Sequence, residues 1–326
     1  MGIKSLLKFL TDQNDIIEQV NNDEIRGKKI AIDISILLYQ IIIAIRNSGS
    51  DLTNNKGDVT SHILGLFNKT IFLLRKGIIP IYVFDGKPPE IKDKILKIRK
   101  DIKMKSLKKL NLATEESERI KYFKRTVSIS KKQFDECKEL LNCMGIPYIE
   151  APEEADSQCA YLSKNGFVDS VLTEDMDILT FGSPDIYRHL TSHKKQPLKI
   201  NLEKLLNKID LTYEQFVEFC IFLGCDYCDS IKYLKAPEIY NIYKNLKSKE
   251  KMIKYLNEKG HKTSCFDNFD DIKKYFMSTN LVNDQITNFN LENPNLDKLE
   301  DLLVNKYGLI KFKIKNKLDF LQKNIQ

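Results

Sequence analysis

Apolar residues recur along this chain in two patterns, which are short runs typical of strands and longer stretches at helical spacing. The short runs predict strands at Lys29–Ile34, Ile79–Phe84, Pro147–Glu150, Ser170–Thr173, Asp185–Leu190 and Leu198–Ile200. The spaced stretches predict helices at Ile3–Leu10, Tyr39–Arg46, Ser61–Lys76, Ser130–Met144, Tyr213–Leu223, Glu238–Leu246, Lys249–Glu258, Ile272–Phe276, Asp297–Lys306 and Lys311–Lys323. Strands and helices mix up to about residue 210, and helices dominate beyond it. This order predicts an α/β fold with a helical C-terminal region.

One more helical stretch begins at Glu90 and is strongly basic. Ile91, Ile95, Ile98 and Ile102 recur there at steps of three and four residues. Residues 87–110 hold ten basic and three acidic side chains, a local charge of +7, and the whole chain is also +7. Such a cluster indicates either a localised contact with a polyanion or a lysine-rich helix that faces solvent. The next segment, residues 112–126, is more polar, and we expect it to be mobile.

Composition places the chain among soluble globular proteins, with 42% hydrophobic and 30% charged residues. No apolar run reaches the ~20 residues that span a bilayer. The seven cysteines are scattered and no signal peptide is evident, so we expect reduced thiols in an intracellular setting. Cys225 and Cys228 form a lone C-x-x-C pair without a second pair of ligands, so no zinc site is expected.

Acidic residues occur in two pairs at the same spacing, Glu154-x-Asp156 and Asp175-x-Asp177. A helix pattern and a short apolar strand separate the pairs, so both are expected at one edge of a sheet. Ligands of open α/β sheets gather at the carboxyl ends of the strands. Each pair alone has another explanation, because acids also stabilise the first turn of a helix.

Three more acids stand at comparable places. Asp33 and Asp85 each close a predicted strand, and Asp226 follows a predicted helix. Asp33 has the alternative of being the N-cap of the next helix. Several strands that each end in an acid are harder to explain by capping alone. Gathered carboxylates repel one another, and Mg²⁺ prefers oxygen ligands, so the sequence predicts a divalent metal site.

Seven sequence blocks occur in an order that resembles the flap endonuclease branch of the XPG/RAD family of structure-specific 5′ nucleases. They are Met1-Gly-Ile-Lys4, Ile32-Asp-Ile-Ser35, Val83-Phe-Asp-Gly-Lys-Pro-Pro89, Ala151–Asp156, Thr173-Glu-Asp-Met-Asp177, Thr180-Phe-Gly-Ser183 and Leu223-Gly-Cys-Asp-Tyr-Cys228. The resemblance extends to about Leu318. It implies a PIN-like fold, in which a twisted, mainly parallel sheet is flanked by helices, with a helical arch and a C-terminal helix-turn-helix region.

The resemblance also implies a division of the chain. We expect a nuclease core in residues 1–210, made of an N-terminal region (1–86), a helical arch (87–132) and an internal region (133–210). Residues 211–326 would form a helical duplex-binding region that completes the core.

The resemblance assigns roles to individual residues. The implied metal ligands are Asp33, Asp85, Glu154, Asp156, Asp175, Asp177 and Asp226. We expect them to hold two Mg²⁺ ions astride one phosphodiester, with Mn²⁺ able to substitute. Glu153 is left as support for a helix dipole.

Basic residues match the family pattern as well. Lys92 and Arg99 match residues at the scissile phosphate, and a spacing of seven predicts that they share one helix face. The implied DNA contacts are Gly2, Tyr39, Arg46, Lys87, Lys92, Arg99, Lys103, Lys232 and Lys235. For Tyr39 the alternative is a core aromatic on an amphipathic helix.

The chain departs from the family pattern at two places. In the family, a glycine-rich hairpin binds K⁺ and the duplex backbone, but here residues 231–237 contain no glycine, which argues against a K⁺ site. No sliding-clamp motif or basic tail is evident before Gln326, so we expect a compact member without a clamp partner. The Lys, Ile and Asn bias indicates an A/T-rich genome, of viral or protist origin.

The expected function is Mg²⁺-dependent cleavage of 5′ flaps at single-strand to double-strand DNA junctions, in replication or repair. We expect a monomer that acts on branched or flapped DNA in the nucleus or another compartment that replicates DNA, and neither membrane binding nor secretion. Two alternatives stay open, which are a mainly 5′→3′ exonuclease of the same family and a DNA-junction-binding module without catalysis. The full set of seven acids argues against the binding module.

Overall fold

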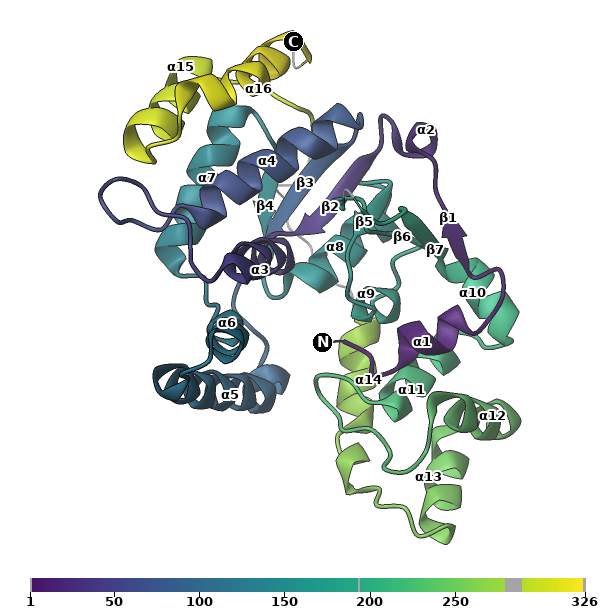
Figure 1. Cartoon of the computed structure of the whole chain (residues 1–326). Coiled ribbons are helices and arrows are strands. Elements are labelled where there is room, and N and C mark those ends of the chain that lie inside the picture. The colour runs from purple at the N-terminus through teal and green to yellow at the C-terminus, as the bar shows by residue number, and fades with distance from the viewer. Residues whose placement is uncertain (1, 193, 279–288, 325–326) are drawn as a thin grey trace. The chain divides into compact units, whose positions relative to one another are not determined.

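The computed structural model describes residues 2–192, 194–278 and 289–324, and they form two compact units (Figure 1). Unit 1 consists of Met1–Glu24, Gly86–Ile95 and Ala151–Asn283. Unit 2 consists of Ile25–Asp85, Leu96–Glu150 and Asp284–Gln326. Each unit joins three segments that are far apart in sequence, so residues as distant as Gly2 and Asp226 belong to the same unit.

Four strands of unit 1 lie in the order β1-β7-β6-β5. Their bounds are Ile17–Gln19 for β1, Ser170–Leu172 for β5, Asp185–Arg188 for β6 and Leu198–Asn201 for β7. Strand β5 is parallel to β6, whereas β7 is antiparallel to both β6 and β1. All three residues of β5 are buried, which is typical of a strand covered on both faces.

The helices of unit 1 surround these strands and extend beyond them. They are α1 (Leu6–Thr11), α8 (Ala155–Lys164), α9 (Asp177–Thr180), α10 (Leu202–Ile209), α11 (Tyr213–Leu223), α12 (Ala236–Leu246), α13 (Lys249–Glu258) and α14 (Phe269–Met277), with 3-10 turns at Glu90–Lys92 and Ser264–Phe266. The short α2 (Asn22–Ile25) ends at the first residue of unit 2. Phe222 of α11 packs on Phe269 of α14 with ring centroids 4.9 Å apart, and both rings are fully buried. This aromatic core fixes α11, whose end leads to Asp226, and α14, which carries Tyr275.

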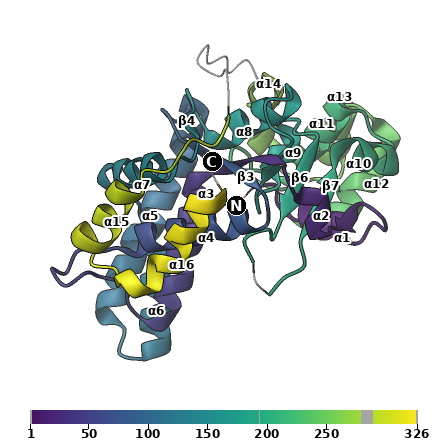
Figure 2. The same cartoon turned by 90° about the horizontal axis from the view of Figure 1, so that it is seen from above.

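Unit 2 is built on three parallel strands, β2-β3-β4. They are β2 (Lys29–Asp33), β3 (Ile79–Phe84) and β4 (Tyr148–Glu150). The helices are α3 (Ile34–Ile45), α4 (Ser61–Arg75), α5 (Asp93–Leu112), α6 (Glu116–Arg125), α7 (Lys131–Met144), α15 (Leu296–Glu300) and α16 (Lys311–Asn324), with a 3-10 turn at Arg46–Ser48 and a π-helix at Asp301–Lys306. Helix α4 lies over β2 and β3, and α16 runs beside α4, where Lys317 donates to Asn68 at 2.6 Å (Figures 1 and 2). The first residues of α5, up to Ile95, belong to unit 1.

The predicted α/β class with mainly parallel strands is confirmed, because β2–β3, β3–β4 and β5–β6 are parallel pairs. Most predicted elements are present within one or two residues of their expected ends. The short elements β1, α2, α9 and α10 were not predicted from the apolar pattern. Within the described part of the chain, no helix is both long and apolar enough to cross a bilayer.

One expectation about the basic stretch stays a prediction and another needs correction. Residues 112–126 were expected to be mobile, and Glu116–Arg125 within them form helix α6. Lys92 and Arg99 were expected on one helix, but Lys92 ends a 3-10 turn and α5 begins at Asp93. The apolar row of α5 is largely exposed, with Ile102 at 53%, so this helix does not bury a conventional apolar face in its own unit.

Candidate active site

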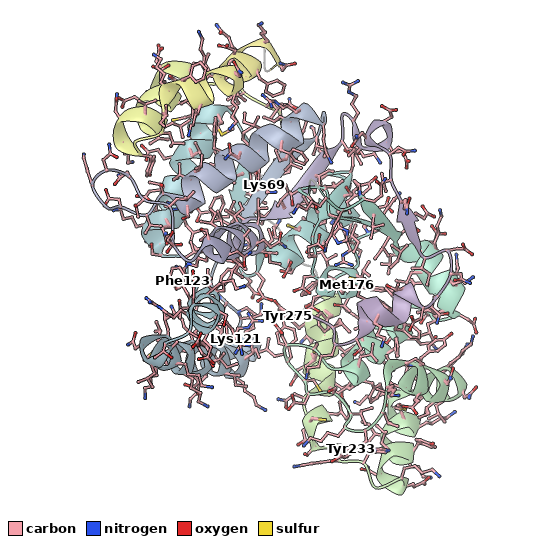
Figure 3. The ribbon with its side chains drawn as sticks, viewed as in Figure 1. Lys69, Lys121, Phe123, Met176, Tyr233 and Tyr275 are labelled. Carbon is pink, nitrogen blue, oxygen red and sulfur yellow. The ribbon has the colours of Figure 1, made fainter. Side chains whose placement is uncertain are left out.

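Asp175 lies in the short segment between strand β5 and helix α9, and Asp177 is the first residue of α9, both in unit 1. The hydroxyl of Thr173 accepts a hydrogen bond from the amide of Asp175 at 2.9 Å, and the amide of Asp177 donates to Asp175 Oδ1 at 3.2 Å. Met176, between the two acids, is buried (Figure 3). The predicted pair is therefore fixed at the carboxyl end of β5 by its own turn.

The surroundings of this pair disfavour the charged form of both carboxyl groups. Burial raises the pKa of Asp175, and the nearby charge of Asp226 raises it further. Burial holds the pKa of Asp177 well above its ordinary value, and repulsion from Asp175 and Asp226 adds to the effect. The ammonium of Lys92 lowers the pKa of both groups. The structure thus brings three predicted metal ligands of unit 1 into mutual electrostatic contact.

The N-terminal segment closes over this pair. Gly2 has φ +86°, and a Cβ atom built on it would lie 1.8 Å from Oδ1 of Asp175 and 3.0 Å from Oδ1 of Asp177. The backbone of Ile3 lowers the pKa of Asp177, which opposes the effect of burial. The amide of Lys4 donates to the carbonyl of Gly224 at 2.8 Å, which ties the segment to the end of α11. Gly2, which the resemblance implied as a DNA contact, therefore packs against the acids themselves.

Glu154, the N-cap residue of α8, is held by three side chains in unit 1. Tyr227 and Tyr275 each donate a hydroxyl hydrogen bond to Oε2 of Glu154 at 2.8 Å, and Lys92 forms an ion pair with Oε1. Burial raises the pKa of both tyrosines, so both phenols stay neutral donors. Tyr275 comes from α14, 121 residues further along the chain (Figure 3). No sequence pattern indicates this partner, because α14 is brought to Glu154 by the aromatic core.

The neighbours of Glu154 separate into distinct roles. Asp156 lies in the first turn of α8. Glu153 precedes the N-cap, and its carbonyl accepts a hydrogen bond from the amide of Gly86 at 2.6 Å. Glu174, an acid beside the Asp175 pair, instead accepts from Arg188 of β6 at 2.7 Å. Glu174 is thus occupied by a structural ion pair and is not a candidate ligand.

Asp33 and Asp85 belong to unit 2, where one serine links them. Asp33 is the N-cap of α3, as the alternative for this residue stated, and its Oδ1 accepts from the amides of Ser35 at 2.6 Å and Ile36 at 3.1 Å. The hydroxyl of Ser35 donates to Oδ2 of Asp85 at 2.5 Å. Asp33 is the last residue of β2 and Asp85 directly follows β3, so both acids lie at the carboxyl ends of adjacent parallel strands, which agrees with the predicted placement. A role of either acid in metal binding stays a prediction.

The donor set of unit 1 fits a hard divalent cation. All of its candidate ligands are carboxylate oxygens, which Mg²⁺ prefers. Oδ1 of Asp177 is buried and has no hydrogen-bond donor among the described residues. In residues 2–192, 194–278 and 289–324, no three acidic, His or Cys side chains form a ready ligand set for one ion. Lys92, paired with Glu154, supplies positive charge to these acids in this structure.

The predicted DNA contacts differ in their surroundings. Tyr39 is 38% exposed, so it is not the core aromatic of the alternative reading, and its hydroxyl donates to the carbonyl of Val127 at 3.0 Å. Arg46 is engaged within the protein, by Asp51 and by the carbonyl of Phe123. Arg99 and Lys103 are half-buried on α5, and Lys87, Lys232 and Lys235 are exposed.

The loop after Asp226 makes its turn without glycine. Tyr233 adopts φ +67°, in the left-handed region that glycine enters without steric cost. Its side chain is 96% exposed and projects from the loop (Figure 3). Ile231 and Ala236, on either side, are buried and anchor the loop to unit 1. The missing glycine therefore leaves the turn in place and adds a protruding aromatic ring.

Comparisons with known proteins agree with this arrangement. Residues 1–106 match the XPG N-terminal domain, and residues 145–226 match the XPG I-region. Flap endonuclease 1 of Nematostella vectensis is 38% identical over 99% of this chain and 88% of its own length. Flap endonuclease 1 of Plasmodium falciparum is also 38% identical over 99% of this chain, but the chain spans only about half of that protein, 53%.

Solved structures show the same architecture. A flap endonuclease-1 from Methanococcus jannaschii superposes with a TM-score of 0.74 at 30% identity, over 95% of this chain and 96% of that chain. The catalytic core of Rad2 in complex with a DNA substrate superposes with a TM-score of 0.73 at 26% identity, over 99% of this chain and 100% of that chain. The expected PIN-like α/β fold is therefore confirmed.

The matched domains and the full-length relatives define the class of protein: this chain belongs to the XPG family. Within that family it falls in the flap endonuclease branch, as its seven sequence blocks predicted.

Proposed function

We propose that this chain is a Mg²⁺-dependent, structure-specific 5′ nuclease that cuts 5′ flaps at single-strand to double-strand DNA junctions. The observation that carries the proposal is the group of mutually repelling carboxylates of Asp175, Asp177 and Asp226, in which Asp177 is buried and Gly2 packs against the first two. Repulsion between neighbouring carboxylates destabilises a fold, and clusters of such carboxylates are typical of functional sites. Membership of the flap endonuclease branch supports the same activity.

The proposed metal ligands are the seven acids of the sequence motifs. Asp175, Asp177, Asp226, Glu154 and Asp156 are supported by their placement in unit 1, and Asp33 and Asp85 by the strand ends that they follow. Bound Mg²⁺ would supply Lewis acidity, both toward an attacking water and toward the leaving oxygen. The chain's own contribution is to orient the carboxylates. Tyr227 and Tyr275 do this for Glu154 by fixing Oε2.

The proposed work of the basic residues is to neutralise charge on the phosphodiester. Lys92 already pairs with Glu154, so its ammonium stands next to the acids of unit 1. Arg99 lies in the N-terminal half of α5, and we propose that it contacts the phosphoryl oxygens as negative charge develops. Lys87 and Lys103 extend the positive surface along the same stretch, which has a charge of +7. This stretch accounts for the whole net charge of the chain.

The substrate we propose is DNA with a 5′ single-stranded branch, and the product is a duplex that keeps a 5′ phosphate. The Rad2 core, with which the chain superposes closely, is described in complex with a DNA substrate. We place the activity in DNA replication or repair, in a compartment that holds replicating DNA. All seven acids lie in one chain, so a monomer suffices for the chemistry.

The second candidate is a mainly 5′→3′ exonuclease, and it shares the same carboxylates. The two activities differ in the products that they release. A 5′-labelled flap would leave as one oligonucleotide after endonucleolytic cleavage and as mononucleotides after exonucleolytic cleavage.

The proposal is tested by product sizing on three substrates that share one sequence, namely a 5′-flapped duplex, a blunt duplex and a single strand. We expect one dominant fragment from the flapped duplex with Mg²⁺, and little product from the other two. Mononucleotides from the blunt duplex would favour the exonuclease. Binding of the flapped duplex without any product in Mg²⁺ or Mn²⁺ would favour the binding module.

A further inference from the structure

Arg46 was expected to contact DNA, but its guanidinium is held by the protein in unit 2. Its Nε and Nη2 atoms donate to the two carboxylate oxygens of Asp51, each at 2.9 Å. Its Nη1 atom donates to the carbonyl of Phe123 at 2.9 Å and to the hydroxyl of Thr126 at 3.3 Å. The guanidinium also stacks 4.0 Å from the ring of Phe123. The side chains of Arg46 and Asp51 are only 13% and 14% exposed, so solvent screens this pair little.

These contacts join two separate segments of unit 2. Arg46 and Asp51 lie just after helix α3, whereas Phe123 and Thr126 lie at the end of α6. Tyr39 of α3 reinforces the junction through its hydrogen bond to the carbonyl of Val127. Figure 1 shows α6 between α3 and α5. The C-terminal end of helix α6 is therefore attached to helix α3 and to the segment that follows α3.

Apolar burial contributes little to this attachment. Among the residues of α5 only Ser106 is buried, and α6 has no buried residue. The two helices contact each other through pairs such as Lys109 over the ring of Tyr122, at 5.6 Å. Segments with few buried apolar contacts open locally at low free energy, so polar contacts decide how well they are ordered. The contacts of the buried Arg46 guanidinium with Phe123 and Thr126 are therefore the polar contacts that hold α6.

We propose that Arg46 and Asp51 are positioning residues, which order the hairpin of α5 and α6 and through it the side chain of Arg99. The planar guanidinium makes this possible, because it fixes both carboxylate oxygens and one backbone carbonyl at once. A lysine keeps the charge but offers no such fork. The effect on cleavage rests on the nuclease function proposed above, whereas the effect on the order of the hairpin does not.

Replacement of Asp51 distinguishes two roles of Arg46, which are ordering of the α5–α6 hairpin and direct contact with DNA. If Arg46 bound a phosphate, Asp51→Asn would remove a competing negative charge, and DNA binding would tighten. If the pair orders the hairpin, the same change weakens the grip on α6, and turnover falls while binding changes little. The two models thus predict opposite consequences for one isosteric substitution.

The experiment combines hydrogen exchange with cleavage kinetics for Arg46→Lys, Asp51→Asn and the double variant. We expect amides of residues 116–126 to exchange about tenfold faster in each variant, with those of β2 and β3 unchanged. We expect kcat on a flapped duplex to fall about tenfold with KM within about twofold, and the double variant to be no worse than either single one. Lys124→Ala is the matched control, because it removes an exposed hydrogen bond to Asn47, 2.9 Å long, that joins the same two segments.

Unchanged exchange in residues 116–126 would overturn the proposal, and so would tighter DNA binding with an unaltered kcat in Asp51→Asn. Faster exchange over the whole protein would point to global unfolding in Arg46→Lys, in which case Asp51→Asn decides. Absence of cleavage by the wild type would refute the nuclease function, and the exchange data would still decide the role of the pair in ordering the hairpin.

Discussion

Gly2 and Asp175 lie so close that no side chain fits between them. A Cβ atom on residue 2 would stand 1.8 Å from Oδ1 of Asp175, and the backbone of Gly2 has φ +86°. Both the space and the backbone conformation therefore require glycine at this position. The start of the chain and the acidic pair, about 175 residues apart, form a single local structure. Gly2 packs directly against the carboxylates, in addition to the DNA contact that the resemblance implied.

Gly2→Ala should abolish most cleavage, because the new methyl group must displace the carboxylate of Asp175 or the N-terminal segment. We expect at least about a hundredfold loss in kcat/KM, equivalent to about 2.7 kcal/mol of transition-state stabilisation, measured under single-turnover conditions. Gly166→Ala is the control, since Gly166 also has positive φ, +74°, but a Cβ there would meet no atom within 4 Å. Equal activity of the two variants would contradict the requirement for free space between residue 2 and Asp175.

Asp177→Asn should stabilise the metal-free protein at neutral pH while it removes activity. The pKa of Asp177 is raised above 3.8 in the folded state by burial, then by Asp175 and Asp226. Between 3.8 and the raised value the folded state binds more protons than the unfolded state, so stability falls as pH rises through that window. The asparagine carries no such penalty. We expect Tm in EDTA to exceed that of wild type by about 2 °C or more at pH 8, with little difference near pH 4.

The control for this measurement is Asp229→Asn, whose carboxylate is 83% exposed and pairs with Lys4 at 3.4 Å. It should leave Tm nearly unchanged at both pH values. A lower Tm of Asp177→Asn at pH 8 would contradict the electrostatic account of the pair.

The sequence predicted those features that local pattern determines. The strands Ile79–Phe84 and Lys29–Asp33, the helix Tyr213–Leu223 and the placement of acids after β2, β3 and β5 were all expected, because β-branched runs and capping residues act locally. Asp33 as N-cap of α3 is of this kind. Ile17–Gln19 was missed, because this short edge strand is specified by its partner β7 and not by its own residues.

Partners that come from distant segments could not be predicted. Tyr275 reaches Glu154 because aromatic packing places α14, and no spacing in the sequence shows this. The pairing of Arg46 with Asp51 and Phe123 could not be predicted either, because it depends on how α6 meets α3. Tyr233 in the left-handed region was also unexpected, because the absence of glycine suggested an altered turn.

Arg99→Ala should lower kcat more than it weakens binding, because its charge matters most where negative charge develops in the transition state. We expect about a hundredfold fall in kcat, with Kd for the flapped duplex within about threefold. Lys97→Ala, an exposed cation on the same helix, is the control and should change neither quantity strongly. A rise in KM alone would make Arg99 an ordinary docking residue.

The loop after Asp226 should bind the duplex without a specific need for K⁺. Tyr233 projects from it at 96% exposure, and Lys232 and Lys235 provide point charges, which give affinity without fixing register. We expect equal cleavage in K⁺ and Na⁺ at equal ionic strength, on substrates with long and with short duplex arms. Tyr233→Gly should tighten binding to the long arm, because it removes the protruding ring.

The control for Tyr233→Gly is Phe312→Ala, which removes an aromatic ring that is 86% exposed between two lysines on α16. A marked K⁺ preference that appears only with the long duplex arm would show that the ion site persists without glycine.

The most direct test of the account is single-turnover cleavage of a 5′-flapped duplex by wild type and by Asp175→Asn, over a range of Mg²⁺ concentrations. We expect cleavage at the junction by wild type, and we expect EDTA to abolish it. For Asp175→Asn we expect a rate below about a tenth of wild type at every Mg²⁺ concentration, with DNA binding retained, because each lost ligand costs several kcal/mol of transition-state stabilisation. Metal-independent cleavage, or an Asp175→Asn rate close to that of wild type, would contradict it.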